Sequence, residues 1–314
     1  MKLRGVGKME LLDQFKGCIL GAAIGDALGM PVEGLTRKEI KEKYGMVKDF
    51  LPSPFNDLKA GEWTDDTEQM IVLAESILET TYLNPENFAE KLKEWYLKSK
   101  NPRIGPTSSK ALINLINNVP WNKAGVYSDT CGAAMRVMSI GLVYHFSLNL
   151  VERYAVISAS VTHKGNAAIG GAVAIAIAIA CLCMDFERDE VVREVVSRVK
   201  TYDDLLAEKI DYSYQISEKD IDFAIEKLGN SMSALDSVPM AFYCYFSSKN
   251  FEDCVIKAVN AGGDTDSIAA MAGAIKGCES KIPEKFLKKL KDYDYLLELA
   301  ERLYKLHEKI VKLS

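Results

Sequence analysis

The sequence predicts an all-α protein folded as one domain. Helical periodicity recurs along nearly the whole chain of 314 residues, and no convincing set of strands remains. The connections are short and rich in turn residues, as at 51–57, 101–106 and 118–122, and none is long or polar enough to be a linker. Because 48% of the residues are apolar, the chain can bury a sizeable core. We therefore expect residues 1–314 to form a single compact helical domain.

We expect a helix wherever apolar residues keep helical spacing for two turns or more, with Gly, Pro, Asn and Asp gathered where helices begin and end. The predicted helices cover 10–29, 65–82, 86–98, 107–117, 132–145, 150–161, 165–184, 188–200, 203–210, 218–228, 237–246, 252–260, 265–277 and 284–311. Charges of both signs alternate between Lys281 and Lys312, which indicates that the last helix has a solvated face.

The first predicted helix carries a stripe of glycines. Gly17, Gly21, Gly25 and Gly29 recur every four residues and so share one face, although each interior Gly costs about 1 kcal/mol relative to Ala. We expect another helix backbone to pack closely there, a direct ligand contact being the alternative. Asp26 and Glu33 stand near the end of this helix, where the helix dipole disfavours negative charge, so they either cap neighbouring amides or face a cation.

The segment 167–184 is uncharged over 18 residues, which is at the lower edge of what could span a bilayer. It is rich in Ala and Gly and lacks aromatic anchors, and this composition suits a helix buried on all sides by other helices. The alternation over 173–180 has the period of a strand, but both alternating types are apolar and the run is too long for a strand. We therefore expect a buried helix.

Composition also bounds the partners and the location. Lys and Arg total 39 against 44 Asp and Glu, a net charge of −5, so no sequence-wide basic field exists to attract nucleic acid. The seven Cys form an odd set without CxxC spacing, as expected of reduced thiols in a cytosolic protein, and Cys181 and Cys183 face different directions on their helix. Residues 1–10 are not followed by a continuous apolar region or a cleavage site, so we expect them not to be a signal peptide. We expect a cytoplasmic protein with no nucleic-acid or membrane partner.

Two predicted helices begin with carboxylates and hydroxyls. Thr64, Asp65 and Asp66 precede one apolar helix, and Asp264 with Asp266 precedes another. Each segment alone is explained by helix capping, because Thr and Asp are good N-caps and acids suit a first turn. If the two segments meet, however, four carboxylates share one place, and their repulsion and desolvation are costly without a cation.

Oxygen ligands of this kind select hard ions such as Mg²⁺, Mn²⁺ or Ca²⁺. The chain has only three His and no His/Cys cluster with zinc spacing, which disfavours zinc, and we expect His145 and His307 to be packing or surface residues. Four carboxylates carry enough charge for two ions about 3.5–4 Å apart, an arrangement that suits hydrolysis.

Five motifs together resemble those of the ADP-ribosylglycohydrolase family, which contains the dinitrogenase-reductase-activating glycohydrolase and the ADP-ribosyl-acceptor hydrolases. They occur in the family's order and extend over most of the chain, from about residue 15 to residue 277. The motifs are GDALG at 25–29 with Glu33, WTDDT at 63–67, GAAMR at 132–136, TH at 162–163 and GGDTDSIA at 262–269.

This resemblance implies an orthogonal helical bundle with a binuclear Mg²⁺ or Mn²⁺ centre at the bottom of an ADP-ribose cleft. Glu33 matches a glutamate at the edge of the metal site, and both Glu33 and Asp66 are candidates for proton transfer. By motif position, the implied metal ligands are Thr64, Asp65, Asp66, Asp264, Asp266 and Ser267. The implied contacts with ADP-ribose are Asp129, Thr130, Cys131, Gly132 and His163.

The chain departs from the family pattern in two places. Ser267 stands where some members have Thr, which keeps the hydroxyl, and Thr130-Cys131-Gly132 stands where many members have Gly-Asn-Gly. The second departure bears on the acceptor rather than on the metal centre. For the diphosphate, helix N-termini near Gly132 and Gly165 are candidate amide donors, although a plain helix start explains Gly132 equally well.

Three functions stay open at this point. The first is a hydrolase that cleaves the glycosidic or ester bond at the anomeric carbon of ADP-ribose on a protein side chain or small acceptor. The second is a two-metal phosphoesterase or pyrophosphatase, which the same oxygen ligands support. The third is a non-catalytic ADP-ribose-binding protein, since a fold does not determine a function. The acceptor, the metal, the general base and the oligomeric state are not determined by the sequence.

Overall fold

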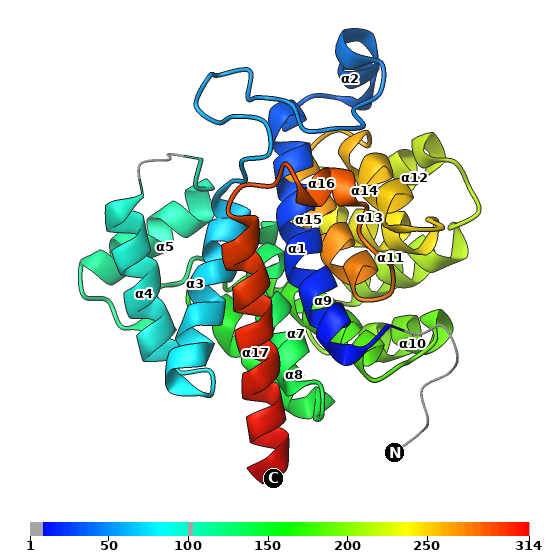
Figure 1. Cartoon of the computed structure of the whole chain (residues 1–314). Helices are drawn as coiled ribbons and strands as arrows, with labels where there is room; N and C mark the ends of the chain where they lie inside the picture. Colours follow the sequence, from blue (N-terminus) through cyan, green and yellow to red (C-terminus); the bar gives the residue numbers. More distant parts are fainter. Residues whose placement is uncertain (1–8, 100–102, 314) are drawn as a thin grey trace.

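The computed structural model describes residues 9–99 and 103–313, and within these ranges the chain is helical with no strand, which confirms the predicted fold class (Figure 1). The helices are α1 (Leu11–Gly29), η1 (Met30–Val32), α2 (Arg37–Tyr44), α3 (Asp65–Thr80), α4 (Pro85–Lys98), α5 (Pro106–Ile116), α6 (Trp121–Ala124), η2 (Cys131–Arg136), α7 (Met138–Tyr144), α8 (Leu148–Ser160), α9 (Asn166–Cys183), α10 (Arg188–Val199), α11 (Asp204–Gln215), α12 (Ile221–Leu228), α13 (Ala234–Phe246), α14 (Phe251–Val259), α15 (Thr265–Gly277), α16 (Glu284–Leu287) and α17 (Tyr293–Leu313).

Two predicted helices are divided in the structure, and two short α-helices and the 3₁₀ turn η1 were not predicted. The range 132–145 consists of the 3₁₀ segment η2 and the helix α7. The range 284–311 is interrupted between α16 and α17, where Asp292 has a φ of 53° that ends the helical path. Only Ile40 is buried in α2, so this helix lacks apolar periodicity, and the capping box of Thr36 and Glu39 defines its start. The single turn α6 after Pro120 is too short to show periodicity.

The glycine stripe of α1 packs against α15, which confirms the helix-packing interpretation. A Cβ atom on Gly17 would lie 1.9 Å from the carbonyl oxygen of Gly277, and one on Gly25 would lie 1.9 Å from that of Ala269. Because the partners on α15 run in the reverse order, the two helices are antiparallel. The stripe ends at Gly29, where a Cβ would lie 2.5 Å from the amide nitrogen of Asp266. Close packing therefore brings the end of α1 against the start of α15.

The helix α9 lies in the centre of the core, as predicted. Every residue from Ala172 to Cys181 is fully buried. The segments Leu11–Val32 and Asn166–Cys183 are both long and apolar enough to cross a membrane by length and composition, but 94% and 89% of their apolar windows are buried inside the fold. Other helices of the same chain thus cover both segments.

The C-terminal helix α17 lies beside α1 and packs on α7 (Figure 1). The rings of His145 and His307 stack there with centroids 4.2 Å apart. Their Nδ1 atoms lie 2.7 Å and 2.8 Å from the carbonyl oxygens of Leu142 and Val143, respectively. Both histidines are buried, so they are packing residues, as expected.

Candidate metal and substrate site

The acidic starts of α3 and α15 meet in the fold. α3 begins with Asp65 and Asp66, and α15 follows Asp264 and carries Asp266 in its first turn. The hydroxyl of Ser267 donates a hydrogen bond of 2.7 Å to Asp66 Oδ2 and so joins the two helices. The two pairs of carboxylates, which are far apart in the sequence, line one cavity. The two acidic segments therefore meet, as the metal hypothesis requires, and helix capping alone explains the four carboxylates poorly.

Asp26, at the end of α1, holds the start of α3. Its buried carboxylate accepts hydrogen bonds from the amide and hydroxyl of Thr64, at 3.0 and 2.9 Å, and from those of Thr67, at 3.0 and 2.6 Å. Of the two roles left open for Asp26, the structure shows the cap. Thr64 also accepts a hydrogen bond from the amide of Asp66 and does not line the cavity, so its role as a metal ligand stays a prediction.

Glu33 stands at the rim of the cavity, beside Asp264 and Asp266. One carboxylate oxygen from each of these three residues lies within 4.8 Å of the others. The Glu33 side chain is 41% exposed, and Arg103 Nη1 lies 3.5 Å from Glu33 Oε2. Arg103 also donates to both carboxylate oxygens of Asp57, at 2.8 and 3.1 Å. Arg103 was not predicted to belong to the site, because its turn is rich in Pro and Gly and carries no other signal in the sequence.

Burial and mutual repulsion raise the pKa of these carboxyls. Desolvation is the largest cause for Asp65, Asp66 and Asp266, whose pKa values stand well above the usual range. Repulsion adds to it, chiefly from Asp26 on the first two and from Glu33 on Asp266. An apposed cation would relieve both penalties.

The donor set of this cavity fits hard divalent cations. Carboxylate oxygens from Asp65, Asp66, Asp264 and Asp266 converge with the Ser267 hydroxyl, and oxygen ligands suit Mg²⁺, Mn²⁺ or Ca²⁺. The described lining includes a single imidazole and a single thiol, fewer soft donors than a structural zinc site uses. These residues would hold the ions.

Thr130, Cys131, Gly132 and His163 line the same cavity, as the motif positions implied. A Cβ on Gly132 would lie 2.8 Å from His163 Cε1, so only glycine permits this approach. The thiol of Cys131 donates to Asp264 Oδ2 at 3.0 Å, and burial raises the pKa of this thiol well above its usual range. The structure thus brings these residues beside the carboxylates, and their contact with substrate stays a prediction.

Asp129 lies outside the lining of the cavity. Its Oδ1 accepts hydrogen bonds from the amides of Ala167 and Ala168, at 2.9 and 3.4 Å, and so caps α9. Two of the amides at the helix N-terminus near Gly165, a candidate donor site for the diphosphate, therefore already have an acceptor within the protein. The substrate role of Asp129 itself stays a prediction.

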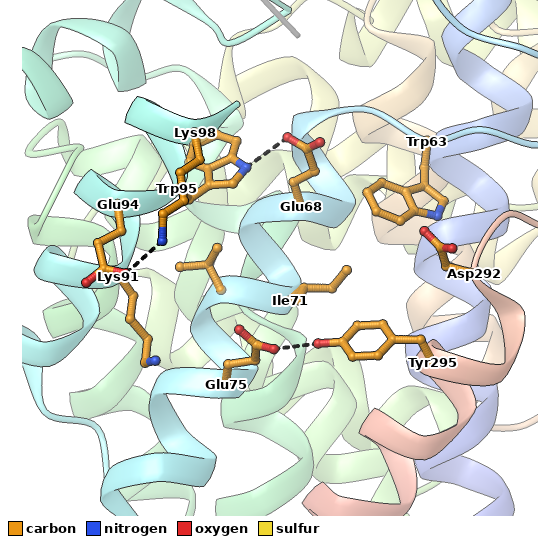
Figure 2. Close-up of a pocket in the computed structure, with 11 residues that line it drawn as sticks. Trp63, Glu68, Ile71, Glu75, Lys91, Glu94, Trp95, Lys98, Asp292 and Tyr295 are labelled. Atoms are coloured by element: carbon orange, nitrogen blue, oxygen red, sulfur yellow. Dashed lines mark hydrogen bonds and ion pairs between the residues drawn. The ribbon is translucent and has the colours of Figure 1, made fainter. Parts of the chain in front are cut away.

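A larger cavity of about 620 Å³ lies between α3, α4 and the start of α17 (Figure 2). Two of its carboxylates have close donors: Trp95 Nε1 donates to Glu68 at 2.9 Å, and the Tyr295 hydroxyl donates to Glu75. Its lining also contains two lysines beside the acids. Among the described residues, the lining of the larger cavity thus has four acids and two lysines, whereas that of the smaller cavity has five acids and one cation, Arg103, so the smaller cavity carries more net negative charge.

The fold and the cavity define an all-α protein with a buried cluster of carboxylates. The chain belongs to the ADP-ribosylglycohydrolase family, whose model matches residues 8–310. A protein of Archaeoglobus fulgidus is 65% identical over 303 residues, which cover 96% of this chain and 99% of that one. The ADP-ribosyl-[dinitrogen reductase] glycohydrolase of Rhodospirillum rubrum is 27% identical, over 88% of this chain and 90% of its own. A solved ADP-ribosylglycohydrolase-related protein complex matches with a TM-score of 0.80 and 25% identity, over 95% and 99% of the two chains.

Proposed function

We propose that this protein is a metal-dependent hydrolase that cleaves the bond at the anomeric carbon of ADP-ribose attached to a protein side chain or a small acceptor, releasing ADP-ribose. Membership of the family indicates an ADP-ribosyl hydrolase. The observation that carries the metal dependence is the convergence of Asp65, Asp66, Asp264 and Asp266 on one buried cavity. Mg²⁺ or Mn²⁺ is the expected cofactor, with two ions as the expected number.

When bound, such cations supply positive charge that orients hydroxyl oxygens and lowers the pKa of water. Breaking the bond at the anomeric carbon builds positive charge on an oxocarbenium-like centre, and the chain's own carboxylates stabilise this charge. Glu33 and Asp66 are the candidates for proton transfer. Glu33 is partly exposed at the rim, and desolvation followed by repulsion from Asp264 raises its pKa, so it holds a proton more readily than a free glutamate does.

The test is to incubate the protein with a panel of ADP-ribose conjugates, linked through arginine, through serine or as an acetyl ester, in Mg²⁺, in Mn²⁺ and in chelator. We expect free ADP-ribose as the product, only when metal is present. Release of AMP would instead indicate the phosphoesterase, and absence of any product with every conjugate would indicate the non-catalytic binder. Turnover of one linkage alone would define the acceptor.

Two acids in the first turn of α3 provide a matched pair of variants. Asp66→Asn removes a charge from the cavity, whereas Glu68→Gln removes one from the larger cavity, where Trp95 supports it. We expect Asp66→Asn to lose turnover by orders of magnitude and Glu68→Gln to keep it. Equal activity in the two variants would contradict the assignment of the small cavity.

A further inference from the structure

The guanidinium of Arg136 is fully buried behind the candidate site, and it forms no ion pair among the residues at 9–99 and 103–313. Its Nη1 donates to Gln69 Oε1 at 2.7 Å, and its Nη2 donates to Thr162 Oγ1 at 2.7 Å and to the carbonyl oxygen of Ser158 at 3.0 Å. A buried cation held only by neutral groups is costly. Two of its hydrogen-bond partners, Thr162 and Gln69, connect Arg136 to residues that line the cavity.

The hydrogen bond from Arg136 to Thr162 leads on to His163. Thr162 Oγ1 lies 2.7 Å from His163 Nδ1, and His163 Nε2 lies 3.0 Å from Thr130 Oγ1 at the cavity. Because Arg136 only donates, it occupies one of the two lone pairs of the Thr162 oxygen and does not compete for the hydroxyl proton. That proton can therefore point at Nδ1, in which case the proton of the neutral ring resides on Nε2.

At the other end of this chain of hydrogen bonds, the partners of Thr130 determine the tautomer of His163. Thr130 donates its hydroxyl proton to Thr107 Oγ1 at 3.1 Å, so its own oxygen is free to accept from His163 Nε2–H. The opposite tautomer would need the Thr130 proton twice and would leave the Thr162 proton without an acceptor among the hydrogen bonds of the described residues.

We propose that Arg136 is a positioning residue that, through Thr162, holds His163 as a neutral Nε2–H donor directed into the cavity, and that, through Gln69, orients the carboxylate of Asp65. The second arm is direct: Gln69 accepts from Arg136 with Oε1, which places its amide nitrogen as the donor to Asp65 Oδ2 at 2.8 Å. One buried guanidinium thus organises the carboxylate side and the His163 side of the same cavity.

This arrangement assigns His163 a role in recognition. His163 Nε2–H is donated to Thr130 Oγ1 in this structure, so a ligand oxygen would replace Thr130 as its acceptor, and a phosphate or hydroxyl oxygen of ADP-ribose is the matching class. Burial, with a smaller contribution from the charge of Arg136, lowers the pKa of His163 to about 3, so the ring stays neutral and does not shuttle protons near neutral pH. The ligand class rests on the proposed function, whereas the tautomer does not.

The first experiment reads the tautomer directly. The chain contains only three His, so long-range ¹⁵N–¹H spectra of histidine-labelled protein are simple, and a His163→Gln variant assigns the signal. We expect the Nε2–H tautomer in the parent and in Thr162→Ser, which keeps the hydroxyl, and loss of the fixed tautomer in Thr162→Val. An Nδ1–H ring in the parent would overturn the proposal even if no variant folds.

The second experiment separates the two arms by calorimetry. We expect Thr162→Val to bind ADP-ribose about tenfold more weakly with parental Mn²⁺ affinity, and Thr162→Ser to bind like the parent. Gln69→Leu should keep the His163 tautomer and lose roughly 10- to 100-fold in Mn²⁺ affinity. Parental tautomer and affinity in Thr162→Val would refute the first arm, and parental Mn²⁺ affinity in Gln69→Leu would refute the second. Failure of the parent to bind ADP-ribose would count against the proposed function and leave the tautomer result intact.

Discussion

Replacing Asp266 by Asn separates the metal hypothesis from helix capping. Asn keeps the size of the side chain, and its Oδ1 can still accept from the amide of Ser267, which now lies 2.9 Å from Asp266 Oδ1. The variant loses one charge from a group of three whose oxygens lie within 4.8 Å of one another. Two unit charges at that separation repel by about 3.5 kcal/mol at an effective dielectric constant of 20.

The metal-free parent escapes part of this repulsion because a raised pKa lets Asp266 take up a proton. We therefore expect metal-free Asp266→Asn to be more stable than the parent by about 1–2 kcal/mol, a rise of a few degrees in Tm. In Mn²⁺ the order should reverse. A ligand that binds only the native state stabilises it by RT ln(1 + c/Kd), where c is its free concentration, and the variant should bind the ion at least a hundredfold more weakly, so it gains less from the metal than the parent does.

The assay is thermal unfolding of both proteins in chelator and in saturating Mn²⁺, with metal stoichiometry and turnover measured on the same samples. We expect the variant to be the more stable protein in chelator and the parent to be the more stable one in Mn²⁺. The variant should also bind fewer ions, and its turnover should be lower by orders of magnitude. Near-parental turnover with unchanged stoichiometry would leave Asp266 as a helix-start residue and refute the assignment of the cavity as a metal centre.

Three further outcomes follow from the structure. Gly21→Ala should have a free energy of unfolding at least about 2 kcal/mol lower than the parent, because its Cβ would lie 2.3 Å from the Gly273 carbonyl oxygen. Gly105→Ala has open space around its Cβ and should change the free energy of unfolding by less than about 0.5 kcal/mol in the same denaturant titration. Between pH 7 and 5 the unfolded state binds a proton at His163 that the folded state does not. In urea titrations over this range the free energy of unfolding of the parent should therefore fall by about 2 kcal/mol relative to that of His163→Gln. Parallel plots of this free energy against pH for the two proteins would contradict the lowered pKa of His163. Saturating ADP-ribose with metal present should raise the Tm of the parent in calorimetry, and an unmoved midpoint would count against the cleft.

The fold was largely predictable because its helices bury apolar faces. Periodicity located α9 and α15, where every turn contributes to the core. It failed at α2, whose stability comes from the capping box of Thr36 and Glu39, and at Asp292, whose positive φ interrupts a continuous apolar pattern. Neither a cap nor a single backbone dihedral changes the spacing of apolar residues, so periodicity cannot report either of them.

The candidate site was predictable only where chemistry is unusual within a short segment. Asp65 with Asp66, and Asp264 with Asp266, are acidic pairs whose proximity in the sequence is itself a signal. Arg103 reaches Glu33 from a separate turn, and Gln69 is one polar residue on an amphipathic helix, so neither carries a signal of its own. Their roles depend on which helices meet, and this is decided by packing.

The glycine stripe connects that packing to the chemistry. A side chain at Gly25 or Gly29 would collide with the backbone of α15 between Thr265 and Ala270, so these glycines set how closely the start of α15 approaches the end of α1. That end carries Asp26, whose four hydrogen bonds orient the start of α3. The separation of the two acidic helix starts is therefore controlled from α1. The glycine stripe, whose first role is helix packing, therefore also fixes the geometry of the carboxylates, because α1 contacts both α3 and α15.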